Sequence, residues 1–137
     1  MEWTKKKINE LAYEIVGCAI AVHRELGSGL LESVYEICME HELKLSGLEV
    51  KRQQPVKINY RGVLVEKELR YDLLVEDCIV VELKSAEIVH PVHESVLMTY
   101  MRLLEKPKGL LINFFTDNIT KSLKPFVNDI FAELPDR

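Results

Sequence analysis

The stretch Tyr71-Asp72-Leu73-Leu74-Val75-Glu76-Asp77-Cys78-Ile79-Val80-Val81-Glu82-Leu83-Lys84 decides the fold of this chain. It contains two apolar runs that are typical of adjacent strands, joined by a turn at Glu76-Asp77. Side chains two residues apart in a strand share a face, so Glu82 and Lys84 point the same way. A two-residue turn would set Asp72 opposite Val81, whereas a three-residue turn sets Asp72 opposite Glu82. We expect the three-residue turn or an equivalent bulge.

Two carboxylates and one ammonium at the ends of these strands are suited to phosphodiester hydrolysis. Carboxylate oxygens are ligands that Mg²⁺ prefers, and a metal with a nearby lysine stabilises charge that grows on phosphate oxygens. A metal-dependent nuclease is therefore the first hypothesis. The alternative is a solvated cross-strand cluster, in which a charge pair contributes roughly 0.2 to 1 kcal/mol. Apolar neighbours on both sides of Glu82 favour instead a strand buried on both faces, where an unpaired carboxylate is costly.

The length of 137 residues predicts one domain over residues 1–137 with a single core. Hydrophobic residues make up 47% of the chain and charged residues 29%, as in soluble globular proteins. No apolar run approaches the roughly 20 residues that a membrane span needs. The N-terminal stretch lacks the apolar segment and cleavage site of a signal peptide. We therefore expect a soluble, cytoplasmic protein with no membrane partner.

The net charge of −4 weighs against a nuclease, because proteins that contact many phosphates usually carry a basic surface. Basic residues such as Lys5 to Lys7, Arg52 and Arg102, if gathered on one face, would still allow a polyanion to bind. The lysine run by itself is typical of a solvated helix end. Nucleic acid therefore stays a candidate partner.

Neither the cysteines nor the histidines predict a zinc site. Cys18, Cys38 and Cys78 are odd in number and widely spaced, which argues against a disulfide framework and against a Cys-x-x-Cys site. Each is expected to be a small buried hydrophobe. The segment that begins His93-Glu94 lacks the second histidine of a His-Glu-x-x-His helix. His90 is expected to precede or cap a helix.

Two helices are expected before the strands. Apolar residues recur at three- and four-residue spacing on one stripe of a long first helix, at Leu11, Ile15, Cys18, Val22 and Leu26. Gly27-Ser28-Gly29 ends this helix. Ser28 is expected to cap a second helix that runs to about Leu45 and ends near Gly47, with Glu32 in its first turn.

The remaining elements predict a mixed α/β protein. Alternation over Val56–Tyr60 predicts a half-exposed strand, and Arg61-Gly62 a turn into a strand over 63–75. Pro91 suits the first turn of a helix that runs to about Leu104, and 109–115 is typical of a buried strand. Pro125 is expected to open a last short helix. The order is two helices, a three-stranded meander, a helix, a strand and a helix, with about four strands in all.

The stretch Gly29-Leu30-Leu31-Glu32-Ser33-Val34-Tyr35 resembles the signature of the GxxExxY protein family, and the later strands resemble the PD-(D/E)XK nuclease superfamily. The resemblance implies a central mixed sheet flanked by helices, as in restriction endonucleases. It further implies that Glu32, Asp72 and Glu82 hold Mg²⁺, or Mn²⁺ in its place. It places Lys84 beside the attacking water. Glu32 considered alone is explained as well by a favourable interaction with the helix dipole.

One position departs from the family pattern. Many relatives place a Gln on the helix after the Glu-x-Lys strand, four residues before a matching Tyr, and this chain has Val96 there while Tyr100 remains. Losing this polar group weakens the case for efficient catalysis but not for metal binding. His93 and Tyr100 are candidate accessory residues, although Tyr35 and Tyr100 have the apolar neighbours of core residues.

A second class of function follows from the same fold. A catalytically weak or inactive member of the fold would act by binding a partner protein or a second copy of itself. Exposed strand edges such as Val56–Tyr60 could serve that purpose. The carboxylate cluster favours the nuclease, and a large apolar surface patch would favour the binding module.

Overall fold

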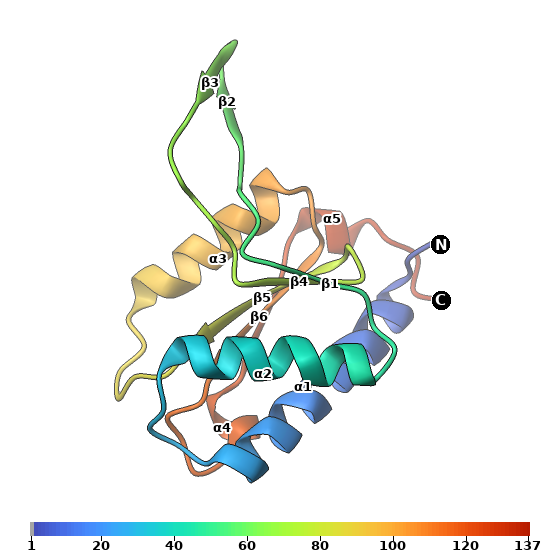
Figure 1. Cartoon of the computed structure of the whole chain (residues 1–137). Coiled ribbons are helices and arrows are strands. Elements are labelled where there is room, and N and C mark those ends of the chain that lie inside the picture. The colour runs from blue at the N-terminus through green and yellow to red at the C-terminus, as the bar shows by residue number, and fades with distance from the viewer. Residues whose placement is uncertain (1) are drawn as a thin grey trace.

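Figure 1 shows the structure, a computed structural model that describes residues 2–137. Its main feature is a five-stranded sheet in the order β1-β4-β5-β6-β7, with helices on both faces. β5 and β6 are parallel and the other neighbouring strands are antiparallel. The strands are β1 (Val50–Arg52), β4 (Leu73–Val75), β5 (Ile79–Lys84), β6 (Lys108–Asn113) and β7 (Lys124–Val127). The expected α/β class is confirmed, with five strands in this sheet where about four were expected.

The core lies in two apolar clusters, one on each face of the sheet. Helices α1 (Lys5–Leu26) and α2 (Glu32–Leu45) pack on one face, and α3 (Pro91–Leu103) packs on the other. Leu73 and Val81 face α1 and α2, whereas Leu74 and Val80 face α3, as the alternation of a strand requires. The central strands are therefore buried on both sides, which explains their continuous apolar runs.

The first two helices were predicted correctly, but the cap of the second was not. Thr4 caps α1, and Gly27 ends it with a φ of 74° that favours glycine. Ser28 was expected to cap α2, yet its hydroxyl lies within hydrogen-bond distance of the main-chain oxygens of Phe114 and Thr116 and shares its one hydrogen between them. α2 begins one turn later, after Leu31, with no side-chain cap. Ser28 instead joins the α1–α2 loop to the end of β6.

The expected strand over 63–75 is wrong in its middle. β2 (Ile58–Tyr60) and β3 (Val63–Val65) form a separate two-stranded hairpin that projects from the body in Figure 1. The chain then leaves regular structure through residues 66–69, forms an isolated bridge between Arg70 and Pro55, and enters the main sheet at β4. The charged run at 66–68 offers no apolar side to a sheet, so it separates the two strands. The expected meander is replaced by this hairpin, and the edge strand β1 takes the place beside β4.

The C-terminal region confirms two elements and corrects one. α3 and β6 lie where Pro91 and the buried run predicted them. Pro125 opens no helix; it lies in β7, opposite Leu110. β7 is the last strand of the sheet, and a proline is tolerated on an edge because its missing N–H breaks no ladder on the outer side.

Two short helices complete the chain. α4 (Ile119–Ser122) precedes β7, and α5 (Asp129–Ala132) follows it, capped by the Asn128 side chain. Within residues 2–137, no helix is both long and apolar enough to cross a membrane.

Candidate functional site

The turn between β4 and β5 sets the register on which the site depends. Val75 pairs with Ile79 and Leu73 pairs with Val81, so the turn holds three residues and Asp72 lies beside Glu82. This confirms the expected register. The turn residues Glu76 and Asp77 have φ values of 53° and 50°, which gives the loop its tight reversal.

The Asp72 and Glu82 carboxylates each accept a hydrogen bond from a backbone N–H near the other residue. The Asp72 N–H donates to Glu82 Oε1 at 3.2 Å, and the Leu83 N–H donates to Asp72 Oδ2 at 2.8 Å. Both side chains are buried. Backbone donors therefore fix the orientation of two acidic groups that the sequence separates by ten positions.

The electrostatics of this pair are unfavourable for two negative charges. Burial raises the pKa of Glu82 to about 9, and the charge of Asp72 adds to the rise. Two adjacent acids in a water-poor place share a proton more readily than they both ionise. A cation at this position would relieve the repulsion, so the pair has the chemistry of a cation site.

Lys84 and Glu32 form the outer part of the site. Lys84 Nζ lies 3.7 Å from Glu32 Oε1, at the N-terminus of α2. Burial raises the pKa of Glu32, Lys84 opposes this rise, and Asp72 adds to it. Within residues 2–137, no three His, Cys, Asp or Glu side chains are grouped closely enough to hold a metal together. The structure thus joins Asp72 to Glu82, and Glu32 to Lys84, as two neighbouring pairs.

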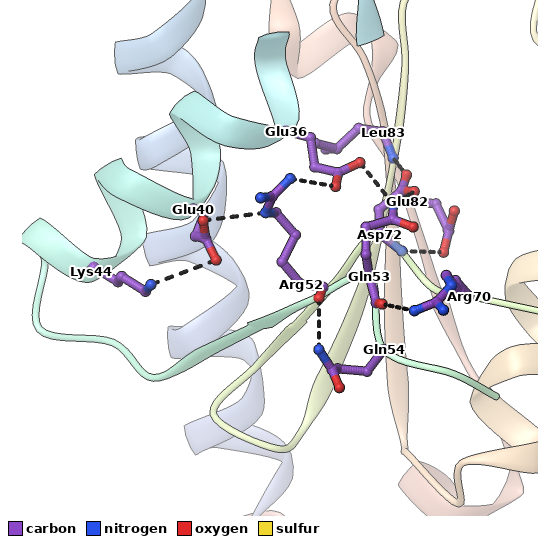
Figure 2. Close-up of polar contacts among 10 residues, drawn as sticks. All are labelled: Glu36, Glu40, Lys44, Arg52, Gln53, Gln54, Arg70, Asp72, Glu82 and Leu83. Carbon is purple, nitrogen blue, oxygen red and sulfur yellow. Dashed lines mark hydrogen bonds and ion pairs between the residues drawn. The ribbon is translucent and has the colours of Figure 1, made fainter. Parts of the chain in front are cut away.

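Figure 2 shows a polar network beside the Asp72–Glu82 pair. The sequence did not predict this network. Glu36, one turn after Glu32 on α2, is buried, and burial followed by the charge of Asp72 raises its pKa. Gln53 Nε2 donates to Glu36 Oε2 at 3.0 Å and to Asp72 Oδ1 at 3.2 Å. Arg52 Nη1 lies 3.4 Å from Glu36 Oε1. Glu36 could have been found from its four-residue spacing to Glu32, which places both on one helix face.

Gln53 gave no signal in the sequence. It directly follows β1, a strand that was not predicted, and its role depends on a backbone conformation that no pattern indicates. Its neighbour Gln54 has the same side chain, yet this donates to the Arg52 main-chain oxygen away from the carboxylates. Only the folded chain distinguishes these two glutamines.

The two accessory candidates, Tyr100 and His93, are influenced by different members of the site. Burial raises the pKa of Tyr100, and the charges of Glu82 and Asp72 raise it further, which places its hydroxyl within their influence. Burial lowers the pKa of His93, and the charge of Lys84 adds to this effect. Val96 is exposed on α3.

Tyr35 has a structural role in the signature. Its ring stacks on Phe114 with 4.3 Å between centroids, and its hydroxyl donates to the Gly27 main-chain oxygen and accepts from the Leu30 N–H. Gly29 has a φ of 93°, which favours glycine in this loop. The Gly-x-x-Glu-x-x-Tyr spacing therefore builds the turn that presents Glu32.

Comparison with known proteins identifies a family. A family model described as the PD-(D/E)XK nuclease superfamily matches residues 9–126, which include both strands of the carboxylate pair. A search of curated proteins and a search of solved structures gave no match.

Proposed function

Because the chain belongs to the PD-(D/E)XK nuclease superfamily over residues 9–126, we propose that it is a Mg²⁺-dependent nuclease that hydrolyses phosphodiester bonds of DNA or RNA. The observation that carries the proposal is the buried Asp72–Glu82 pair, held by two backbone hydrogen bonds and followed by Lys84. We take residues 1–137 as one nuclease-like domain. The Gly29–Tyr35 signature supports a place among GxxExxY proteins.

The donor set fits a hard divalent cation. Asp72 and Glu82 offer carboxylate oxygens. Burial and then the charge of Asp72 raise the pKa of Glu82, and a bound cation would offset both effects by stabilising the ionised carboxylates. We propose these two residues as ligands, and Glu32 would join them as a third only after leaving its ion pair with Lys84, because the three carboxylates are not grouped around one point in the structure. When bound, Mg²⁺ supplies Lewis-acid polarisation of the phosphate and activation of water, and Mn²⁺ can replace it.

The other residues act on the substrate and on the attacking water. The Lys84 ammonium would be freed from its ion pair with Glu32 when Glu32 binds the metal. It would then stabilise negative charge on the phosphate oxygens and orient the water. Tyr100, whose pKa is raised by burial and by both carboxylates, would offer a hydroxyl to the same place, and His93, whose pKa is lowered by burial and by Lys84, would contact nucleic acid.

Metal titration combined with a cleavage assay tests this proposal. Calorimetry would measure Mn²⁺ and Mg²⁺ binding to the wild type, to Asp72→Asn and to the control Asp117→Asn, an exposed aspartate before α4. Cleavage would be followed on single- and double-stranded DNA and RNA. We expect binding and cleavage to be lost in Asp72→Asn alone. Equal binding by all three proteins would refute the site, and metal binding without any cleavage would refute the activity.

The projecting hairpin favours a second candidate function, a binding module that pairs with a second copy of the chain. Ile58 pairs with Val65 and Tyr60 with Val63, so these four side chains share one face of the ribbon. Tyr60 and Val63 are 60% and 63% exposed. A two-stranded ribbon is only marginally stable alone, and an uncovered apolar face is typical of an interaction surface.

Sedimentation over a range of protein concentrations tests this second candidate. The double variant Tyr60→Ser with Val63→Ser removes the two most exposed side chains of the apolar face, and Lys57→Ser, an exposed residue just before β2, is the control. We expect a concentration-dependent dimer in the wild type and in the control, and a monomer in the double variant. A wild type that stays monomeric at the highest concentration rules out self-association through this hairpin.

A further inference from the structure

Gln53 is the residue that joins the carboxylates of two different elements. Its single amide nitrogen donates one hydrogen to Glu36 Oε2 at 3.0 Å and the other to Asp72 Oδ1 at 3.2 Å (Figure 2). A primary amide has only two hydrogens to donate, so both are used on these two acids. Among the described residues, no buried side-chain nitrogen or oxygen is without a hydrogen-bond partner.

The backbone of Gln53 is held in an uncommon conformation to reach this position. Its φ is 53°, in the left-handed region that non-glycine residues seldom adopt. The Gln53 N–H donates to the Asp72 main-chain oxygen at 3.0 Å, and Arg70 Nη1 donates to the Gln53 main-chain oxygen at 2.7 Å. Strained backbone that the surrounding structure holds in place is frequent at functional sites.

The amide has a definite effect on Asp72. Leu83 donates to Asp72 Oδ2 and Gln53 donates to Asp72 Oδ1, so each oxygen of this carboxylate has its own donor. Two fixed donors set the rotation of the carboxylate and therefore the direction of its remaining lone pairs. The same amide also places a donor between the like charges of Asp72 and Glu36.

We propose that Gln53 is a positioning residue that orients the Asp72 carboxylate toward Glu82 and holds Glu36 against it. The proposal deepens the proposed function and rests on it for the metal that Asp72 would bind. Gln53 acts through Asp72 and need not touch the substrate.

The adjacent glutamine provides a matched control. Gln54 is exposed and its side chain donates to the Arg52 main-chain oxygen, so Gln54→Met removes an amide without affecting either acid. Gln53→Met keeps the side-chain length and removes both donors. Gln53→Gly removes the side chain and also relieves the left-handed backbone, so it should fold even if Gln53→Met does not.

Two measurements on the full chain test the proposal. The first is the amide resonance of Leu83 in the metal-free protein, which reports the hydrogen bond to Asp72 Oδ2. The second is Mn²⁺ affinity by calorimetry. We expect both Gln53 variants to shift the Leu83 resonance and to weaken Mn²⁺ binding by roughly 10- to 100-fold, the usual effect of losing a group that orients a ligand. Gln54→Met should change neither.

The outcomes separate this inference from the proposed function. An unchanged Leu83 resonance in both Gln53 variants would overturn the positioning role, as would a shifted resonance with wild-type Mn²⁺ affinity. The third outcome is that the wild type binds no Mn²⁺ while the Leu83 resonance of the Gln53 variants still differs from that of the wild type and of Gln54→Met. That result supports the positioning of Asp72 and removes the metal from the proposed function.

Discussion

Replacing Glu82 with glutamine should stabilise the metal-free protein, although Glu82 is a proposed ligand. Burial and Asp72 raise the pKa of Glu82 from 4.5 to about 9. At pH 7 the folded protein therefore retains a proton that the unfolded chain has lost. From the unfolded pKa of 4.5 to pH 7 is about 2.5 pH units. At about 1.36 kcal/mol per unit, the free energy of unfolding of the wild type falls by roughly 3 kcal/mol relative to that of a protein with a neutral side chain at this position.

Glutamine is neutral and has the same shape as the protonated acid. Its oxygen can still accept from the Asp72 N–H, and its amide can donate to the Asp72 carboxylate, so the existing contacts survive. Because the folded pKa is raised, the contribution of the wild-type group is fully present below pH 4.5 and is lost as the pH rises toward 9. The two proteins should therefore be equally stable in acid and diverge at neutral pH.

Urea unfolding in the presence of EDTA at several values between pH 5 and pH 8.5 measures this difference. We expect the advantage of Glu82→Gln to grow by about 1.4 kcal/mol for each pH unit and to reach about 3 kcal/mol at pH 7. Glu66→Gln, at an exposed position of the hairpin connection, is the control and should match the wild type. Equal stability of wild type and Glu82→Gln at every pH would refute the electrostatic reasoning.

Three further predictions follow from the same structure. Mn²⁺ affinity of the wild type should rise up to tenfold for each pH unit between about 6 and 9, because the proton on Glu82 must leave before the metal binds; calorimetry measures this, and a flat profile contradicts it. Lys84→Met should abolish cleavage while Mn²⁺ affinity stays within a few-fold of the wild type, as measured by cleavage assay and calorimetry; cleavage at the wild-type rate would remove Lys84 from the reaction. Gly109→Ala should destabilise the fold by about 1 to 3 kcal/mol in thermal unfolding, because its Cβ would lie 2.7 Å from Met101 Sδ, and an unchanged melting temperature would show that α3 moves freely.

The candidate site was predictable where it depends on local pattern. The apolar runs and the Glu-Leu-Lys triplet predicted the end of β4, β5 and the register that joins Asp72 to Glu82, but not the start of β4. The pairing of Glu32 with Lys84, and the bridge from Gln53 to Glu36, were not predictable. They depend on how α2 lies across the sheet, which no stretch of sequence encodes by itself.

The sequence by itself determined the elements whose apolar pattern corresponds to burial on one side or on both sides. α1 has an apolar stripe, and β5 and β6 are continuous apolar runs. The bounds of α2 and α3 were indicated by residues near their ends, Gly47 after α2 and Pro91 at the start of α3. Only the tertiary structure decided the short edge strands β1 and β7, the separation of the hairpin and the position of Gln53. Edge strands of three or four residues take their conformation from the main-chain bonds of a neighbour, and the left-handed backbone of Gln53 is held by Asp72 and Arg70.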